Sequence, residues 1–238
     1  VILCLVSAIS NKMKAKDIWK KVLIVGLVAF AVAGWWFIRN AILYNGDFLG
    51  INAQNECGDK YALDQFKPSI RLTVQKRGEN LLDMLFGERW LLTTALSFVG
   101  IFGYQSIVMS PKIYFVYFGI WIIGGIGCIL SFKKLFKFNK NEKNRYLLNY
   151  IFVLSIIIPI ALSIIYSYTS DFQAQGRYIM GIIIPFTYFV VNGIQTILDK
   201  IIKSKKIRNI IIILIITLII AISFRALFAY VIPAYKVK

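Results

Sequence analysis

Residues able to carry acid–base or metal chemistry are scarce in this chain. Histidine is absent, which excludes a Ser-His-Asp triad, an imidazole general base and a histidine metal site. Eleven carboxylates remain, so acid–base chemistry would fall to these, to lysine or to tyrosine. The three cysteines, Cys4, Cys57 and Cys128, have no CxxC spacing and predict neither a metal site nor a disulfide framework. We therefore expect no metal ion and no other cofactor.

The polar cluster with the most chemical content runs from Asp171 to Tyr178 and directly precedes an apolar run. One interpretation is an interfacial anchor made by Arg177 and Tyr178, since arginine and tyrosine favour the membrane boundary. The other is a lipid-phosphate site. There the Arg177 guanidinium binds phosphate oxygens in pairs, and Gly176 lets the backbone approach closely. Asp171 would then either orient Arg177 or repel the phosphate.

Two further arginines lie at the end of an apolar run or inside one. Arg39 follows the pair Trp35-Trp36, and Arg225 follows a long run of aliphatic residues. Each side chain either extends to the lipid headgroups or contributes to a phosphate site. The nearby residues Asn45-Gly46-Asp47 predict a turn.

The composition excludes a soluble enzyme. Hydrophobic residues make up 58% of the 238 residues and charged residues only 16%. Soluble domains are about 45–50% apolar and about 25% charged. The same hydrophobicity excludes a disordered chain. The prediction is an all-α, polytopic transmembrane helical bundle.

Five full membrane spans are predicted, over Val22–Ile38, Ile113–Phe132, Leu147–Tyr168, Tyr178–Leu198 and Ile210 to about Tyr230. The apolar residues 1–10 fit the second half of a truncated span, so residues 1–238 are expected to be a fragment forming a single integral membrane domain. Pro159 and Pro185 are expected to bend their helices. The polar residues Asn149, Asn192 and Gln195 are expected to form hydrogen bonds between helices.

The basic residues predict the orientation. Residues 11–21, 133–145 and 197–208 hold 16 of the 28 lysines and arginines and fall on one side if the spans alternate. The positive-inside rule makes that side the cytoplasm, with residues 39–112, residues 169–177 and the C-terminus outside a plasma membrane. The net charge of +17 thus reflects topology and attraction to membrane lipids rather than nucleic-acid binding.

The long outer loop over residues 39–112 is expected to contain one more helix. Residues 90–104 are apolar, but a crossing there would place the later basic loops outside. They therefore predict an interfacial or re-entrant helix over about 90–104. Ser110-Pro111 predicts a helix start, with serine at the N-cap and proline at the first helical position.

Several short motifs occur in a fixed order and carry a family resemblance. They are Trp36-Phe37-Ile38-Arg39-Asn40 with Tyr44-Asn45-Gly46-Asp47, then Ser97-Phe98-Val99-Gly100-Ile101-Phe102-Gly103, then Gly176-Arg177-Tyr178 followed by Pro185. In this order, over about residues 30–190, the chain resembles the C-terminal half of a bacterial family of polytopic membrane proteins. That family is similar to the GT-C glycosyltransferases, which use polyprenyl-phosphate-linked sugars. Val99 stands where the family usually has tryptophan.

The resemblance implies a membrane glycosyltransferase acting on the outer face in cell-envelope glycan synthesis. It implies lipid-phosphate contacts by Arg177 and Arg39, with Asp171, Tyr178 and Arg225 in support. It places the catalytic base in an earlier outer loop, so this fragment alone is expected to be inactive. The expected partners are membrane lipids and a polyprenyl-phosphate sugar donor. The alternative is a non-catalytic membrane protein, either a lipid-carrier or polysaccharide transporter or an assembly subunit.

Overall fold

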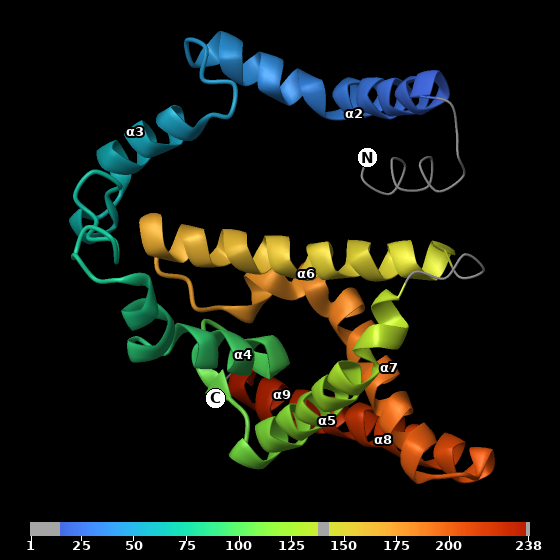
Figure 1. Ribbon diagram of the computed structural model, residues 1–238. Coiled ribbons are helices and arrows are strands. Elements are labelled where there is room, and N and C mark those ends of the chain that lie inside the picture. The colour runs from blue at the N-terminus through green and yellow to red at the C-terminus, as the bar shows by residue number, and fades with distance from the viewer. Residues whose placement is uncertain (1–14, 138–142, 237–238) are drawn as a thin grey trace. The chain divides into compact units, whose positions relative to one another are not determined.

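A computed structural model describes residues 15–137 and 143–236, which are helical apart from one short hairpin, loops and turns (Figure 1). Five helical runs are long and apolar enough to cross a membrane. They are α2 (Ala15–Leu43), α5 (Pro111–Phe136), α6 (Lys143–Thr169), η4 with α7 (Gly176–Ile182, Ile183–Ile201), and α8 with η5 and α9 (Lys205–Ala226, Leu227–Val231, Ile232–Tyr235). These runs contain the five predicted spans. The truncated span expected over residues 1–10 lies outside the described residues.

Every one of these helical runs extends beyond the apolar stretch that predicted it. A helix can continue from an apolar stretch into the polar residues beside it where no proline or glycine interrupts it, and lysine is a good helix former. Thus α5 ends with Lys133 and Lys134 in its last turn. The basic segment between the fourth and fifth runs shrinks to residues 202–204, because α8 begins at Lys205 with Ser204 as its N-cap.

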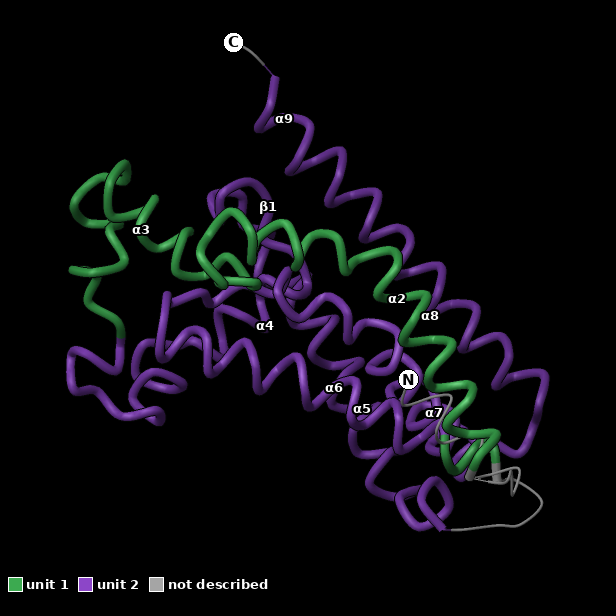
Figure 2. Tube along the Cα trace, turned by 90° about the horizontal axis from the view of Figure 1, so that it is seen from above, with its two compact units in different colours: residues 1–73, 140–147 green, residues 74–139, 148–238 purple. Residues whose placement is uncertain are grey.

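The chain divides into two compact units, which are described separately (Figure 2). The first comprises residues 1–73 and 140–147. Its described elements are α2, α3 (Ile51–Tyr61), η1 (Asp64–Phe66) and the first turn of α6. The second comprises residues 74–139 and 148–238 and holds the other elements. Outside the long helical runs these are the π-helical turn η2 (Asp83–Gly87), α4 (Trp90–Gly100), β1 (Ile101–Phe102) and β2 (Ile107–Val108).

The helix predicted over about residues 90–104 is shorter in the structure. It ends at Gly100, and β1 then pairs with β2 in an antiparallel hairpin, with Ile101 opposite Val108. Gly103 and Gln105 adopt positive φ angles of 62° and 58°, which close the hairpin turn. The Tyr114 hydroxyl donates to the Gly100 carbonyl at 2.8 Å, so a side chain satisfies one carbonyl that the helix end leaves open.

Glycines bring α5 and α7 into backbone contact in the second unit. A Cβ atom at Gly193 would lie 1.8 Å from the Gly124 carbonyl oxygen, and one at Gly127 would lie 1.9 Å from the Gly193 oxygen. Only glycine fits at this distance. Small residues of this kind let apolar helices pack closely in a membrane, where burial of apolar surface gives little driving force.

The predicted inter-helix hydrogen bonds form at one of the three polar positions. Asn149 of α6 is fully buried; its amide donates to the Leu135 carbonyl at 2.7 Å and accepts from the Tyr188 hydroxyl at 2.8 Å. It therefore joins α5, α6 and α7. For Asn192 the prediction is wrong, because its amide donates to Tyr188 within α7. The Gln195 side chain has no hydrogen-bond partner among the described residues.

We expect Gly193→Ala to destabilise the second unit, because the new methyl group meets backbone that cannot turn aside. Overpacking of this kind costs about 1–3 kcal/mol or more. The measurement is thermal unfolding of the purified protein in detergent, followed by circular dichroism. Gly125→Ala on α5 is the matched control, since its Cβ would have no neighbour within 4 Å. Equal melting temperatures for the two variants would contradict the contact.

Candidate functional site

Arg177 is the second residue of η4, a run of tighter 3₁₀ turns that leads into α7. Pro185 lies in the first turn of α7. Proline has no N–H to donate to the carbonyl four residues earlier, and its ring crowds that carbonyl. The carbonyl of Gly181, near the end of η4, therefore receives no hydrogen bond from residue 185. Pro159, in contrast, lies inside α6, which continues through it from Lys143 to Thr169.

Gly176 fixes this end of η4 against α4. A Cβ atom on Gly176 would lie 2.2 Å from the Phe98 nitrogen and 2.3 Å from its Cα, so no other residue fits. Gly176 was predicted to let the backbone approach a ligand closely. The structure instead uses the glycine to bring η4 against the backbone of α4. As a result Arg177 lies beside the C-terminal half of α4 and the hairpin that follows it.

A cavity of about 250 Å³ opens at this junction. Its amide and charged side chains come from three places: Gln105 of the hairpin turn, Gln175 before η4, and Arg177 in η4. The rest of the lining is Ser97, Phe98, Val99, Gly100, Ile101, Phe102, Gly103, Tyr104 and Met180. Among these described lining residues there is no aspartate or glutamate, so arginine is the one charged group facing the cavity.

The Arg177 guanidinium is exposed and mostly uncommitted. Its Nη2 donates to the Tyr178 hydroxyl at 3.0 Å, and its Cζ lies 4.9 Å from the centre of the Tyr178 ring. A guanidinium has five N–H donors in a planar fork. One hydrogen bond to Tyr178 leaves most of them available to an anion. Tyr178 thus contacts the guanidinium through both its hydroxyl and its ring, and its supporting role at a phosphate site stays a prediction.

Asp171 is connected to this cavity by a chain of side-chain hydrogen bonds. Its carboxylate accepts from Gln173 Nε2 at 2.6 Å, and Gln173 Oε1 accepts from Gln175 Nε2 at 3.0 Å. Gln105 Nε2 donates to the Ala174 carbonyl at 3.2 Å and ties the hairpin to the same loop. One N–H of each glutamine amide therefore helps to hold the lining in place, and the arginine is the charged donor that faces the cavity.

The loop carrying these glutamines is anchored in a buried core. Trp90 Nε1 donates to Ser167 Oγ at 2.9 Å, and the Gln173 backbone N–H donates to the same oxygen at 3.3 Å. Ser167 is fully buried and Trp90 is 1% exposed. Around them pack Val74, Met84 and Ala174. A buried polar group is costly unless paired, so these bonds fix the loop between α6 and η4.

The other two predicted arginines lie elsewhere. Arg39 belongs to the first unit, where it is exposed, donates to Asn40 Oδ1 at 3.3 Å and lies 5.4 Å from the centre of the Trp36 ring. Arg225 is exposed in the last turn of α8, and it is not among the residues that line the Arg177 cavity. Of the predicted phosphate contacts, only Arg177 lines this cavity.

The first unit has a separate cavity of about 700 Å³, formed by the turn after α2 and the start of α3. The predicted turn is confirmed: Asn45 and Gly46 have φ angles of 50° and 94°. The Asp47 carboxylate accepts from the backbone N–H groups of Ile51, Asn52 and Ala53 at 3.3, 2.7 and 3.1 Å. An internal carboxylate therefore already occupies the anion-binding end of α3.

Sequence reasoning did not identify Gln105, Gln173 or Gln175 as site residues. The available signal was their spacing: Gln173 and Gln175 alternate just before the Gly176-Arg177 pair, and Gln105 follows a hairpin-forming glycine. No group of three or more His, Cys, Asp or Glu that could hold a metal ion occurs in residues 15–137 and 143–236. Comparison with family models, curated proteins and solved structures finds no match to this chain.

Proposed function

We propose that this chain is part of an integral membrane protein that binds a polyprenyl-phosphate-linked sugar at the outer face of a plasma membrane. The observation that carries the proposal is the exposed Arg177 guanidinium, which lines a cavity where an apolar helical run begins. Headgroup phosphates lie at that depth in a bilayer. Guanidinium binds phosphate with paired, charge-assisted hydrogen bonds, which an apolar cavity wall strengthens.

The reaction we propose is glycosyl transfer in cell-envelope glycan synthesis. An acceptor hydroxyl attacks the anomeric carbon of the sugar, and a carboxylate base takes its proton. The bond from that carbon to the phosphate oxygen breaks, and its electron pair stays on the phosphate. Arg177 would stabilise the charge that develops on this leaving group. The base would come from outside residues 1–238, in keeping with the resemblance to GT-C enzymes.

One observation favours the alternative, a non-catalytic lipid-carrier or polysaccharide transporter or an assembly subunit. No carboxylate is among the described residues that line the Arg177 cavity. Such a site could bind a lipid phosphate without acting on it. Both functions share the phosphate contact, and they differ in whether sugar is released from the lipid.

The proposed topology follows from the basic segments. We place residues 11–21, 133–145 and 197–208 in the cytoplasm, and residues 39–112, residues 169–177 and the C-terminus outside. Five full spans would cross the membrane after a truncated first span. The apolar α4 would lie at the outer interface and not cross.

The phosphate contact is tested by Arg177→Lys. Lysine keeps the charge but cannot form the paired contact of a planar guanidinium. Losing one charge-assisted hydrogen bond costs about 1.5–3 kcal/mol, roughly 10- to 150-fold in affinity. The measurement is polyprenyl-phosphate binding to the purified protein in nanodiscs. Arg225→Lys is the matched control, because Arg225 does not line the cavity. Arg39→Lys tests the second predicted contact. Unchanged affinity in correctly inserted Arg177→Lys would leave this residue as a membrane anchor.

The topology is tested by thiol labelling in whole cells. With Cys4 and Cys128 replaced by serine, a membrane-impermeant reagent should label native Cys57, which is exposed on α3. Single cysteines introduced as Lys137→Cys or Lys203→Cys, in a background without Cys57, should stay unlabelled until the cells are permeabilised. Labelling at 137 with protection at 57 would reverse the orientation.

A further inference from the structure

An exposed apolar surface lies outside the five long runs, on the helical turns over residues 81–87 and the first turn of α4. Leu82 and Phe86 are 64% and 68% exposed, as much as Ile122 on α5 at 62%. Leu81, Leu91 and Leu92 are also exposed. We call these five residues the leucine-phenylalanine surface. Clustered apolar side chains of this size in an otherwise polar loop indicate an interaction site.

The segment that carries this surface is fixed on its other side. Met84 and Trp90 are 0% and 1% exposed, and both belong to the buried core of the second unit. Between them the chain forms the π-helical turn η2 and then a left-handed residue, Arg89, with φ 59°. The core residues therefore hold the exposed side chains outward, and the exposure does not arise from an unstructured segment.

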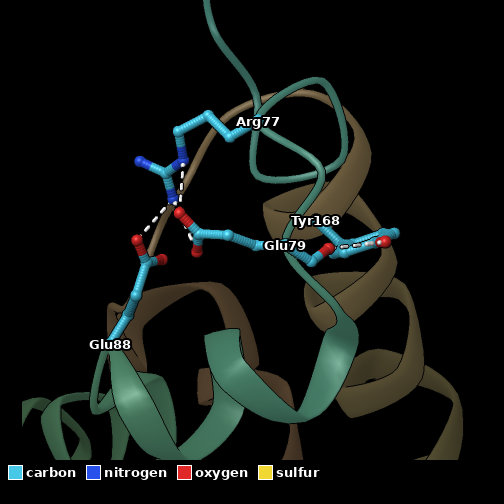
Figure 3. Close-up of polar contacts among 4 residues, drawn as sticks. All are labelled: Arg77, Glu79, Glu88 and Tyr168. Atoms are coloured by element: carbon cyan, nitrogen blue, oxygen red, sulfur yellow. Dashed lines mark hydrogen bonds and ion pairs between the residues drawn. The ribbon is translucent and has the colours of Figure 1, made fainter.

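The segment is tied to the end of α6. The Gln75 backbone N–H donates to the Tyr168 carbonyl at 3.1 Å, and the Tyr168 hydroxyl donates to the Glu79 carbonyl at 3.0 Å (Figure 3). Trp90 bonds Ser167 one residue earlier. Because α6 ends at Thr169, these bonds hold the segment beside the C-terminal end of a helix that is long and apolar enough to cross a membrane.

Arg77 closes the loop and pairs with two of its carboxylates. Figure 3 shows its guanidinium between Glu79 and Glu88, with the Arg77 Nε to Glu79 Oε1 distance at 3.0 Å and a second ion pair from Nη2 to Glu88 Oε1. This arrangement joins the two ends of residues 77–88. It also offsets carboxylate charge that would be unfavourable close to a bilayer.

We propose that the leucine-phenylalanine surface inserts into the lipid leaflet at the C-terminal end of α6. The occupant is lipid and not a second protein, because α6 itself presents exposed aliphatic residues up to this level, among them Leu162 and Ile165 at 61% and 57%. The surface thus continues an apolar boundary that the bilayer covers. Exposed Arg89 at its edge suits the headgroup phosphates. This inference rests on the membrane spans alone and not on phosphate binding by Arg177.

Spin labelling tests the insertion. In a protein with Cys4, Cys57 and Cys128 replaced by serine, a nitroxide is attached at Leu82→Cys or Phe86→Cys and the protein is placed in nanodiscs. Oxygen concentrates in lipid and a nickel chelate stays in water, so their collision rates report depth. We expect both labels to favour oxygen, as a label at Ile122→Cys on α5 should. A label at exposed Asp83→Cys, between the two test sites, should favour the nickel chelate.

Two outcomes would overturn the proposal. Labels at 82 and 86 that collide with the nickel chelate as often as the label at 83 would place the surface in water. Labels shielded from both reagents would indicate a protein partner. A spectrum broadened by a second nitroxide nearby would indicate a second copy of the chain. Thermal unfolding of each variant checks the fold, which should be unaffected because both native side chains are exposed.

Discussion

The approach of Gly176 to the backbone of Ser97 and Phe98 is the contact on which the candidate site depends. A side chain at position 176 would overlap α4, so η4 and α4 can meet only through glycine. This contact brings the loop before η4 against the hairpin after α4. Gln105, which is distant along the chain from Gln175 and Arg177, then lines one cavity with them. Without the contact, Arg177 would lie at a helix end with no cavity beside it.

The second unit combines such backbone contacts with buried polar bonds. Gly124, Gly127 and Gly193 bring α5 and α7 together as Gly176 brings η4 to α4. Asn149 and Ser167 then join neighbouring elements with side-chain hydrogen bonds in fully buried positions. Both devices suit a membrane protein, since lipid is as apolar as leucine and gives helices little reason to associate by burial. An unpaired polar group in the same surroundings would be costly.

The sequence predicted the features that depend on composition and local chemistry. Long apolar runs gave the five helical segments, Ser110-Pro111 marked the start of α5, and Asn45-Gly46 marked a turn. Features that depend on tertiary contact were missed. In the sequence, the hairpin after Gly100 is an apolar stretch that resembles a continued helix. In the structure, the helix ends there and the Tyr114 hydroxyl donates to the Gly100 carbonyl. Asn192 and Asn149 are the same residue type with different neighbours. Asn192 donates to a carbonyl of its own helix, whereas Asn149 joins three helices.

The candidate site divides in the same way. Arg177 and Tyr178 could be selected from residue type and position before an apolar run. Their glutamine neighbours could not, because Gln105 meets the loop at residues 171–175 only after the hairpin forms. From Asp171 a chain of hydrogen bonds runs through Gln173 to Gln175, since each glutamine can both donate and accept. The role of Asp171 toward Arg177 stays a prediction.

The central claim is that glycine contact with α4 builds a phosphate cavity at Arg177. Its most direct test compares polyprenyl-phosphate affinity in Gly176→Ala and Gly181→Ala, two substitutions in the same 3₁₀ run. A Cβ atom at 176 meets the Phe98 backbone, whereas one at 181 has no neighbour within 4 Å. We predict that Gly176→Ala weakens binding by roughly tenfold or more, the size of one lost charge-assisted bond, and that Gly181→Ala binds as the unsubstituted chain does. Equal, undiminished affinity in both variants would contradict the account.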